Sequence, residues 1–170
     1  ESKWWKFRIP EPDDVIGMRA HVQPYQKPHP PIGVAGVSPN SPTLKMAGQF
    51  GWIPMSINLA PPNQIKTHWD SIAEGAEDAG NKPDRSRWRV AREVFIADTT
   101  AEARRLVIEG TMARDFEEYF IPMLSKDDRL GIMKNDSDMP DSDVTIDYLI
   151  DNVFVVGSVA EVTQKLNDLY

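Results

Sequence analysis

Short apolar runs alternate along the chain with segments in which apolar residues recur at helical spacing. The first of these runs is almost wholly apolar, which is typical of a strand covered on both faces. This alternation predicts an α/β fold of parallel strands joined by right-handed βα crossovers. The expected strands are residues 32–37, 52–59 and 88–97, and the expected helices end at Gly51, open at Pro62 and begin at Thr99, the last with some irregularity near Gly110.

The organisation along the chain is that of a single partial domain, residues 1–170. Its first part is irregular, because its many prolines exclude a helix or a central strand. The expected parts are a lead-in over residues 1–31, βα units over 32–124, an acidic loop over 125–143 and a terminal helix over 158–169.

Two architectures fit this order of elements, an open doubly wound sheet and part of a (β/α)8 barrel. A complete barrel needs about 250 residues, so the three or four units of this chain would form a half. In both architectures ligands bind at the carboxyl ends of the strands. The turn that follows Val37 lies at such an end and is the first place to look for a site.

The turn between the first strand and the first helix has the composition of a small anion site. Ser41 is placed to cap the helix, and Pro42 suits its first position. The free N–H groups of the first helical turn, with the hydroxyls of Ser38, Ser41 and Thr43, would then converge on one phosphate. An ordinary capped βα turn has the same local pattern, so both interpretations stay open.

Composition narrows the functional classes. A formal net charge of −7 and the absence of a basic run argue against a nucleic-acid or anionic-membrane surface. No apolar stretch reaches the length of a membrane span, and no signal-peptide pattern opens the sequence. The absence of cysteine excludes disulfides and thiolate sites, and a cytoplasmic location is expected. Because the first residue is Glu1, we expect a piece of a longer protein.

No metal site is predicted. The three histidines share no metal-ligand spacing, and the aspartates of residues 125–143 are out of register with a calcium loop. His68 is expected on the surface of its helix, and His29 in a local hydrogen bond. His21 lies in the proline-rich lead-in, where nothing indicates a ligand role.

For the other polar and aromatic residues near the strands, a structural role is the first interpretation. Glu93 lies within an apolar strand, so its carboxylate must face solvent or be paired. Trp52, Met55 and Asn58 lie on or beside the second strand, where core packing is expected and lining of a binding pocket is the alternative. The arginine pairs are expected to be solvated or ion-paired. They are Arg89 with Arg92 and Arg104 with Arg105.

Five strings of residues resemble the luciferase-like flavin monooxygenases, the family that includes bacterial luciferase and the limonene and alkanal monooxygenases. One of them is Val34-Ala-Gly-Val-Ser-Pro-Asn-Ser41, which contains the capped turn. All five stand in the order of the family and at roughly its spacing, and they span nearly the whole chain. The strings cover residues 24–32, 34–41, 47–55, 94–103 and 155–162.

The resemblance implies the C-terminal half of a (β/α)8 TIM barrel, approximately its fifth to seventh strands. The earlier strands and the final one would lie outside this sequence, and residues 153–156 would be a connector rather than a barrel strand. The resemblance also implies reduced FMN at the C-terminal face of the barrel. The turn that would hold its phosphate consists of Val37, Ser38, Asn40, Ser41 and Thr43.

The implied function is that of an FMN-dependent monooxygenase that oxygenates a small organic substrate with O2. Reduced flavin would come from a separate NAD(P)H-dependent flavin reductase, and the complete protein would be a homo-oligomer. Catalytic residues would lie in the missing N-terminal half. Two alternatives stay open: a deazaflavin-dependent oxidoreductase on the same barrel, and a non-catalytic half-barrel that binds phosphate or a partner chain.

Overall fold

The computed structural model describes residues 3–6, 8, 11–17 and 24–169 of the chain. The chain divides into two compact units, Glu1–Pro31 and Ile32–Tyr170. The described residues of the first unit form turns, bends and irregular chain. The helices and the parallel strands belong to the second unit.

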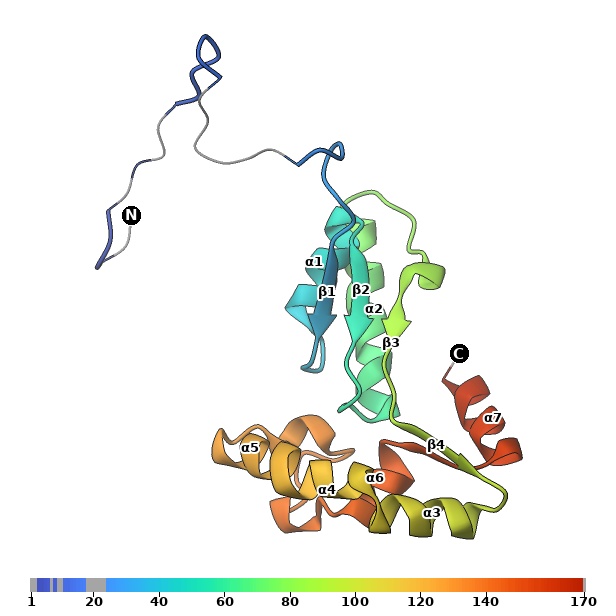
Figure 1. Cartoon of the computed structure of the whole chain (residues 1–170). Helices are drawn as coiled ribbons and strands as arrows, with labels where there is room; N and C mark the ends of the chain where they lie inside the picture. The colour runs from blue at the N-terminus through green and yellow to red at the C-terminus, as the bar shows by residue number, and fades with distance from the viewer. Residues whose placement is uncertain (1–2, 7, 9–10, 18–23, 170) are drawn as a thin grey trace. The chain divides into compact units, whose positions relative to one another are not determined.

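Three parallel strands form the first sheet, in the order β1–β2–β3. Helices α1 and α2 connect them and cover one face of the sheet, as Figure 1 shows. The loops that follow β1 and β2 therefore lie at the same end, as the βα pattern predicted. The elements are β1 (Gly33–Gly36), α1 (Pro42–Phe50), β2 (Ile53–Ser56), α2 (Pro62–Asp78) and β3 (Arg89–Val90).

Local signals fix both ends of α1. The Ser41 hydroxyl accepts a hydrogen bond from the Leu44 N–H at 3.4 Å, and Pro42 occupies the first helical position. Gly51 ends the helix with a φ of 63°, in the left-handed region that glycine adopts without strain. The predicted capping of this helix is confirmed.

Two glycines allow α1 and α2 to pack backbone to backbone. A Cβ atom on Gly75 would lie 1.9 Å from the Lys45 carbonyl oxygen, and one on Gly48 would lie 2.1 Å from the Ile72 carbonyl oxygen. Both separations are far below van der Waals contact. The contact between the two helices therefore requires glycine at both positions.

A second, two-stranded parallel sheet pairs β4 (Val94–Ala97) with β5 (Val155–Ser158). The single strand predicted over residues 88–97 is wrong, because the chain leaves the first sheet after β3 and joins the second at β4. Between the two strands, Arg92 and Glu93 bond to the loop after β2 instead of extending a strand. Residues 155–158 form a strand rather than a connector, and this strand is outside the first sheet.

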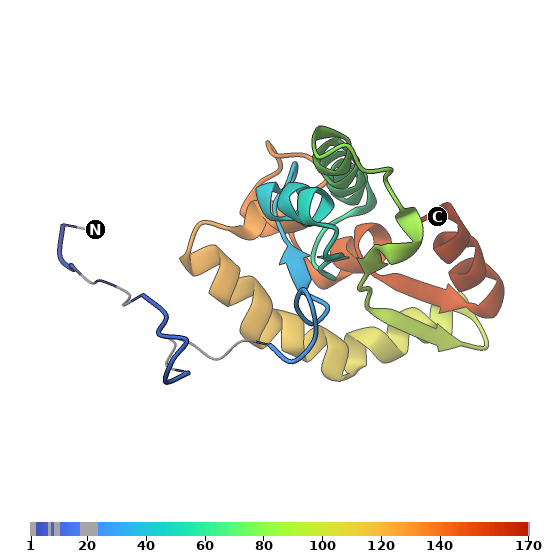
Figure 2. The same cartoon turned by 90° about the horizontal axis from the view of Figure 1, so that it is seen from above.

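Helices α3, α6 and α7 pack against this second sheet, while α4 and α5 extend away from it (Figure 2). A helical segment runs from residue 100 to 126, with the predicted irregularity at Gly110 and a π-helical stretch before its last turn. No helix among the described residues is long and apolar enough to cross a bilayer. The elements are α3 (Thr100–Glu109), α4 (Thr111–Asp115), the π-helical stretch η2 (Phe116–Phe120), α5 (Ile121–Lys126), α6 (Ile146–Asn152) and α7 (Val159–Asp168), with short 3-10 turns at Arg85–Arg87, Leu130–Met133 and Asp141–Asp143.

The main apolar core lies among α3, η2, α6 and β5. Phe116 is 2% exposed and meets the Phe154 ring edge-on, with 4.7 Å between the ring centroids. Leu149 on α6 and Val107 on α3 are fully buried in the same cluster. On the surface Arg104 bonds Asp147 and Asp151, as expected of an ion-paired arginine, and so ties α3 to α6.

Candidate functional site

The loop between β1 and α1, residues 37–41, contains the predicted phosphate-binding turn. Ser38 and Asn40 are exposed, while Val37 and Thr43 are half-buried. Ser41 is 2% exposed, and its hydroxyl is occupied by the helix cap. The structure therefore brings the five predicted residues into one turn, with the Ser38 side chain open to solvent and the Ser41 side chain serving the helix.

Charge and close packing at this helix end suit an anion. The first turn of α1 carries no acidic residue, so its dipole is uncompensated. Pro42 has no N–H and the Leu44 N–H donates to Ser41, so the Thr43 N–H is the donor of this turn that an anion could use. A Cβ atom on Gly36 would lie 2.3 Å from Leu44 Cγ and 2.9 Å from Ser41 Oγ. Glycine thus lets the end of β1 approach the helix closely. This geometry fits a phosphate group at the N-terminus of α1.

A buried hydrogen-bond network lies directly beneath the loop. His68 on α2 is 0% exposed, and its Nδ1 atom lies 2.9 Å from Ser56 Oγ. Its Nε2 atom lies 2.9 Å from the Ser38 carbonyl oxygen. Trp88 donates its indole N–H to the same Ser56 oxygen, also at 2.9 Å. The network links β2, α2 and the residue before β3 to the loop.

A neighbouring residue of α2 contacts the loop as well. The Asn40 N–H donates to Thr67 Oγ1 at 2.9 Å, and the Thr67 hydroxyl donates to the Gln64 carbonyl oxygen at 2.7 Å. The N–H of Asn40 is therefore occupied, and Asn40 adopts a left-handed φ of 50°. Within the predicted turn, Asn40 contributes to loop shape through its backbone.

The surface position expected for His68 is wrong. The side chain falls on the apolar stripe of α2, three residues after Ile65 and four before Ile72, both buried. That spacing places all three residues on one helix face and could have identified a buried histidine from the sequence. His29 forms the expected local hydrogen bond, with Nδ1 2.7 Å from the Pro30 carbonyl oxygen. His21 lies outside the described residues.

Burial of His68 makes the stability of the chain depend on pH. Burial lowers the pKa of His68 below its ordinary 6.5, the bond to the Ser38 carbonyl opposes this shift, and nearby Arg92 adds to it. Below pH 6.5 the unfolded chain therefore takes up a proton that the folded chain does not. We expect the free energy of unfolding to fall as the pH drops below 6.5, by at most about 1.4 kcal/mol per pH unit.

Urea unfolding across this pH range measures the effect, with His68→Gln as the comparison. The variant has no titrating imidazole, so it should lose less stability on acidification than the wild type. An equally steep loss in both proteins would show that other groups cause the pH dependence.

Three other residues near β2 were considered as possible pocket lining, namely Asn58, Trp52 and Met55. Each of them has a structural partner or lies away from the loop. The Asn58 side-chain amide donates a hydrogen bond to the Glu93 carboxylate. Glu93 is therefore paired, which is one of the two states expected of it. Trp52 precedes β2 and stacks on Phe50, with 5.0 Å between ring centroids, so it lies at the strand's amino end. Met55 is 43% exposed on the uncovered face of the first sheet.

Arg92 departs from the solvated or ion-paired state expected of it. Its Nη1 atom donates to the Ala60 carbonyl oxygen at 2.5 Å, while Nε and Nη2 are buried without a partner in the described part of the chain. Burial lowers the pKa of Arg92 to about 10, so the guanidinium remains charged at neutral pH.

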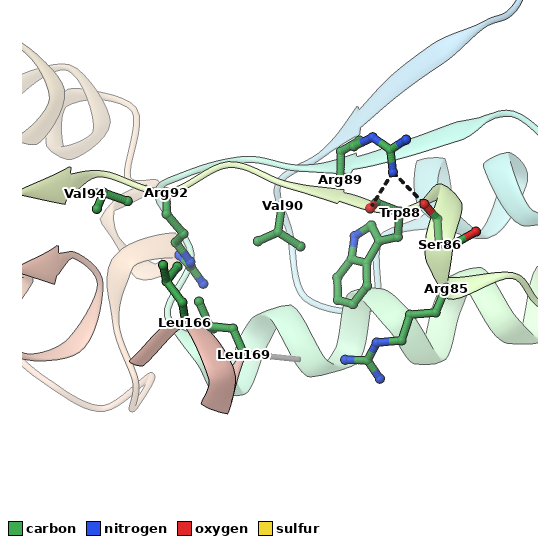
Figure 3. Close-up of a pocket in the computed structure, with 9 residues that line it drawn as sticks. All are labelled: Arg85, Ser86, Trp88, Arg89, Val90, Arg92, Val94, Leu166 and Leu169. Atoms are coloured by element: carbon green, nitrogen blue, oxygen red, sulfur yellow. Dashed lines mark hydrogen bonds between the residues drawn. The ribbon is translucent and has the colours of Figure 1, made fainter. Parts of the chain in front are cut away.

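A cavity of about 570 Å³ lies beside the segment that joins β3 to β4 (Figure 3). The Trp88 ring and the Arg92 side chain lie on one side of this segment, and Arg89 lies on the other, where it donates to the Ser86 and Trp88 carbonyl oxygens. The cavity shares no lining residue with the loop after β1. Trp88 belongs both to its wall and to the His68 network.

The residues that the structure describes include no group of three or more histidine, aspartate or glutamate side chains placed to hold a metal ion. The loop after β1 is the candidate site, because its geometry, its charge and its sequence pattern all suit an anion.

The chain belongs to the luciferase-like monooxygenase family, whose sequence profile matches residues 10–170. It is 38% identical to 3,6-diketocamphane 1,6-monooxygenase of Pseudomonas putida, over 100% of this chain and 46% of that protein. It is 29% identical to limonene 1,2-monooxygenase of Rhodococcus erythropolis, over 81% of this chain and 33% of that protein. The chain thus spans less than half the length of these relatives.

A solved structure shows the same fold. It is a type II Baeyer-Villiger monooxygenase, the oxygenating constituent of 3,6-diketocamphane monooxygenase from Pseudomonas putida, in complex with FMN. The similarity has a TM-score of 0.74 and 39% sequence identity, and it covers 99% of this chain and 47% of that one. The predicted α/β fold class and partial TIM barrel are confirmed, as is the resemblance to the family.

Proposed function

We propose that the chain is part of an FMN-dependent monooxygenase and that the loop after β1 holds the FMN phosphate. The observation that carries the proposal is the N-terminus of α1, whose dipole no acidic residue compensates, beside the exposed Ser38. The FMN complex of a structure 39% identical to this chain supports the choice of ligand. Thr43 adds a half-buried hydroxyl at the same helix end.

When bound, reduced FMN would supply two electrons, so that one atom of O2 enters the substrate and the other leaves as water. The residues of this chain contribute binding and orientation. The Thr43 N–H at the N-terminus of α1 and the Ser38 hydroxyl would hold the phosphate. The names of the relatives favour a cyclic ketone or terpene as the small organic substrate.

The proposal includes partners for the complete protein. Reduced flavin would come from a separate NAD(P)H-dependent flavin reductase, which suits a cytoplasmic location where NAD(P)H is available. The complete protein would be a homo-oligomer, and the part of the barrel absent from this sequence would surround the flavin ring and supply the catalytic residues.

Binding of FMN and of riboflavin to the purified chain tests the phosphate site. We expect FMN to bind at least about tenfold more tightly, because only FMN carries the phosphate. Ser38→Asp should remove most of this preference, since a carboxylate would lie close to the phosphate, and should leave riboflavin affinity unchanged. Flavin fluorescence during titration gives both dissociation constants.

Ser137→Asp is the matched control, because it adds the same charge at an exposed serine outside the loop. It should bind both ligands as the wild type does. Equal affinities of the wild type for FMN and riboflavin would refute the phosphate site. For the complete protein with substrate and reduced FMN under 18O2, a product that has gained one 18O atom supports a monooxygenase, and an unlabelled substrate favours a deazaflavin enzyme or a non-catalytic half-barrel.

A further inference from the structure

With a neutral imidazole, the network around His68 has one arrangement of protons that pairs each of these groups. The Trp88 indole N–H can only donate, so Ser56 Oγ accepts it. The Ser56 hydroxyl then donates its own proton to His68 Nδ1. A neutral imidazole with an unprotonated Nδ1 carries its proton on Nε2, where it faces the Ser38 carbonyl oxygen. The Ser38 carbonyl can only accept, so it sets the tautomer of His68, and Ser56 and Trp88 complete the network.

The opposite tautomer would leave two acceptors facing each other. With the proton on Nδ1, the lone pair of Nε2 would lie 2.9 Å from the Ser38 carbonyl oxygen, and neither atom could donate. Ser56 supports the required tautomer by donating to Nδ1, and its oxygen in turn accepts from Trp88.

The loop itself has few other constraints on its shape. Between the end of β1 and the Ser41 cap, the long-range bonds described for it are those from His68 to the Ser38 carbonyl and from Asn40 to Thr67. Both partners belong to one turn of α2, and they fix the loop at two residues only two positions apart. The backbone between them is held while the Ser38 side chain stays exposed.

We propose that His68 is the positioning residue of the phosphate loop, acting through the Ser38 carbonyl, with Thr67 fixing Asn40 beside it. This inference rests on the proposed function of the loop. His68 does not touch the ligand. By holding one carbonyl oxygen away from the site, it keeps an acceptor from facing the phosphate and orients the donors of Ser38 and of the α1 N-terminus outward.

Two substitutions of His68 separate this role from a general contribution to stability. In His68→Gln the side-chain amide nitrogen can occupy the place of Nε2 and still donate to the Ser38 carbonyl. In His68→Asn the shorter side chain reaches only the place of Nδ1, so it keeps a partner for Ser56 and loses the bond to Ser38. Both variants remove the imidazole and create space beneath the loop.

Titration with FMN and with riboflavin, at a temperature where both variants are folded, measures the effect. We expect His68→Asn to weaken FMN binding at least tenfold with riboflavin binding unchanged, and His68→Gln to stay within about threefold of the wild type. An equal loss in both variants, or unchanged FMN affinity in His68→Asn, would overturn the inference. The phosphate site itself fails separately, if the wild type does not prefer FMN.

A second pair keeps the inference testable if His68→Asn does not fold. Thr67→Val removes the acceptor for the Asn40 N–H at nearly constant volume, and Thr67→Ser retains it. The FMN preference should fall in the valine variant and persist in the serine variant. If the valine variant kept the preference for FMN over riboflavin, positioning of the loop by α2 would be contradicted.

Discussion

Gly75→Ala should destabilise the chain by at least about 3 kcal/mol. In an ordinary exposed helix this substitution would stabilise by about 1 kcal/mol, because alanine is the better helix former. Here the new methyl group would lie 1.9 Å from the Lys45 carbonyl oxygen, and a backbone atom cannot move aside as a flexible side chain can. The clash outweighs the helix propensity, so α1 and α2 must separate.

Urea denaturation of the two proteins measures this change in the free energy of unfolding. Gly131→Ala is the control, since nothing lies within 4 Å of its added methyl group and its backbone needs no left-handed φ. It should change stability by less than about 0.5 kcal/mol. A neutral or stabilised Gly75→Ala would mean that the two helices pack less closely than the structure shows.

Phe116→Ala should cost about 3 to 5 kcal/mol through the cavity it leaves in the main core. Phe116 is 2% exposed, and its ring contacts Phe154 and Phe120, with centroids at 4.7 and 4.9 Å. It lies in the π-helical stretch, which carries few other buried side chains, so the core has little means of closing over the gap.

Tyr119→Ala provides the comparison for Phe116→Ala, because it truncates an aromatic side chain in the same stretch that is 60% exposed. Its edge-on contact with Phe120 limits the expected loss to about 1 kcal/mol. Thermal unfolding of both variants shows which of them loses more stability. Similar losses in the two would show that the π-helical stretch is not anchored by Phe116.

The sequence predicted the parts of the fold that depend on local signals. The cap at Ser41, the glycine end at Gly51 and the helix start at Thr99, whose hydroxyl accepts from the Glu102 N–H, are all present. The alternation of apolar runs predicted parallel strands correctly. The break between β3 and β4 was missed, since it depends on Arg92 bonding a carbonyl group in a distant loop.

In the candidate site, too, local signals predicted some features and long-range contacts determine the others. The turn with Ser38 and Ser41 could be selected from its residues, because helix capping acts over a few positions. The support from His68 and Trp88 could not, since these bonds join residues that are far apart in the sequence. The helical spacing of His68 with Ile65 and Ile72 could have indicated burial, although a surface position was expected, and its two polar partners had no sequence signal.

The pairing of β4 with β5 bears on the order in which the chain assembles. Val94 pairs with Val155, whereas Gly33 pairs with Ile53, so the second sheet closes a loop about three times longer than the first. The entropy lost on closing it is larger, and much of its length is helical segments whose contacts are local. We therefore infer that these helices form before the β4–β5 ladder does, and that α7, which packs on that ladder, docks late.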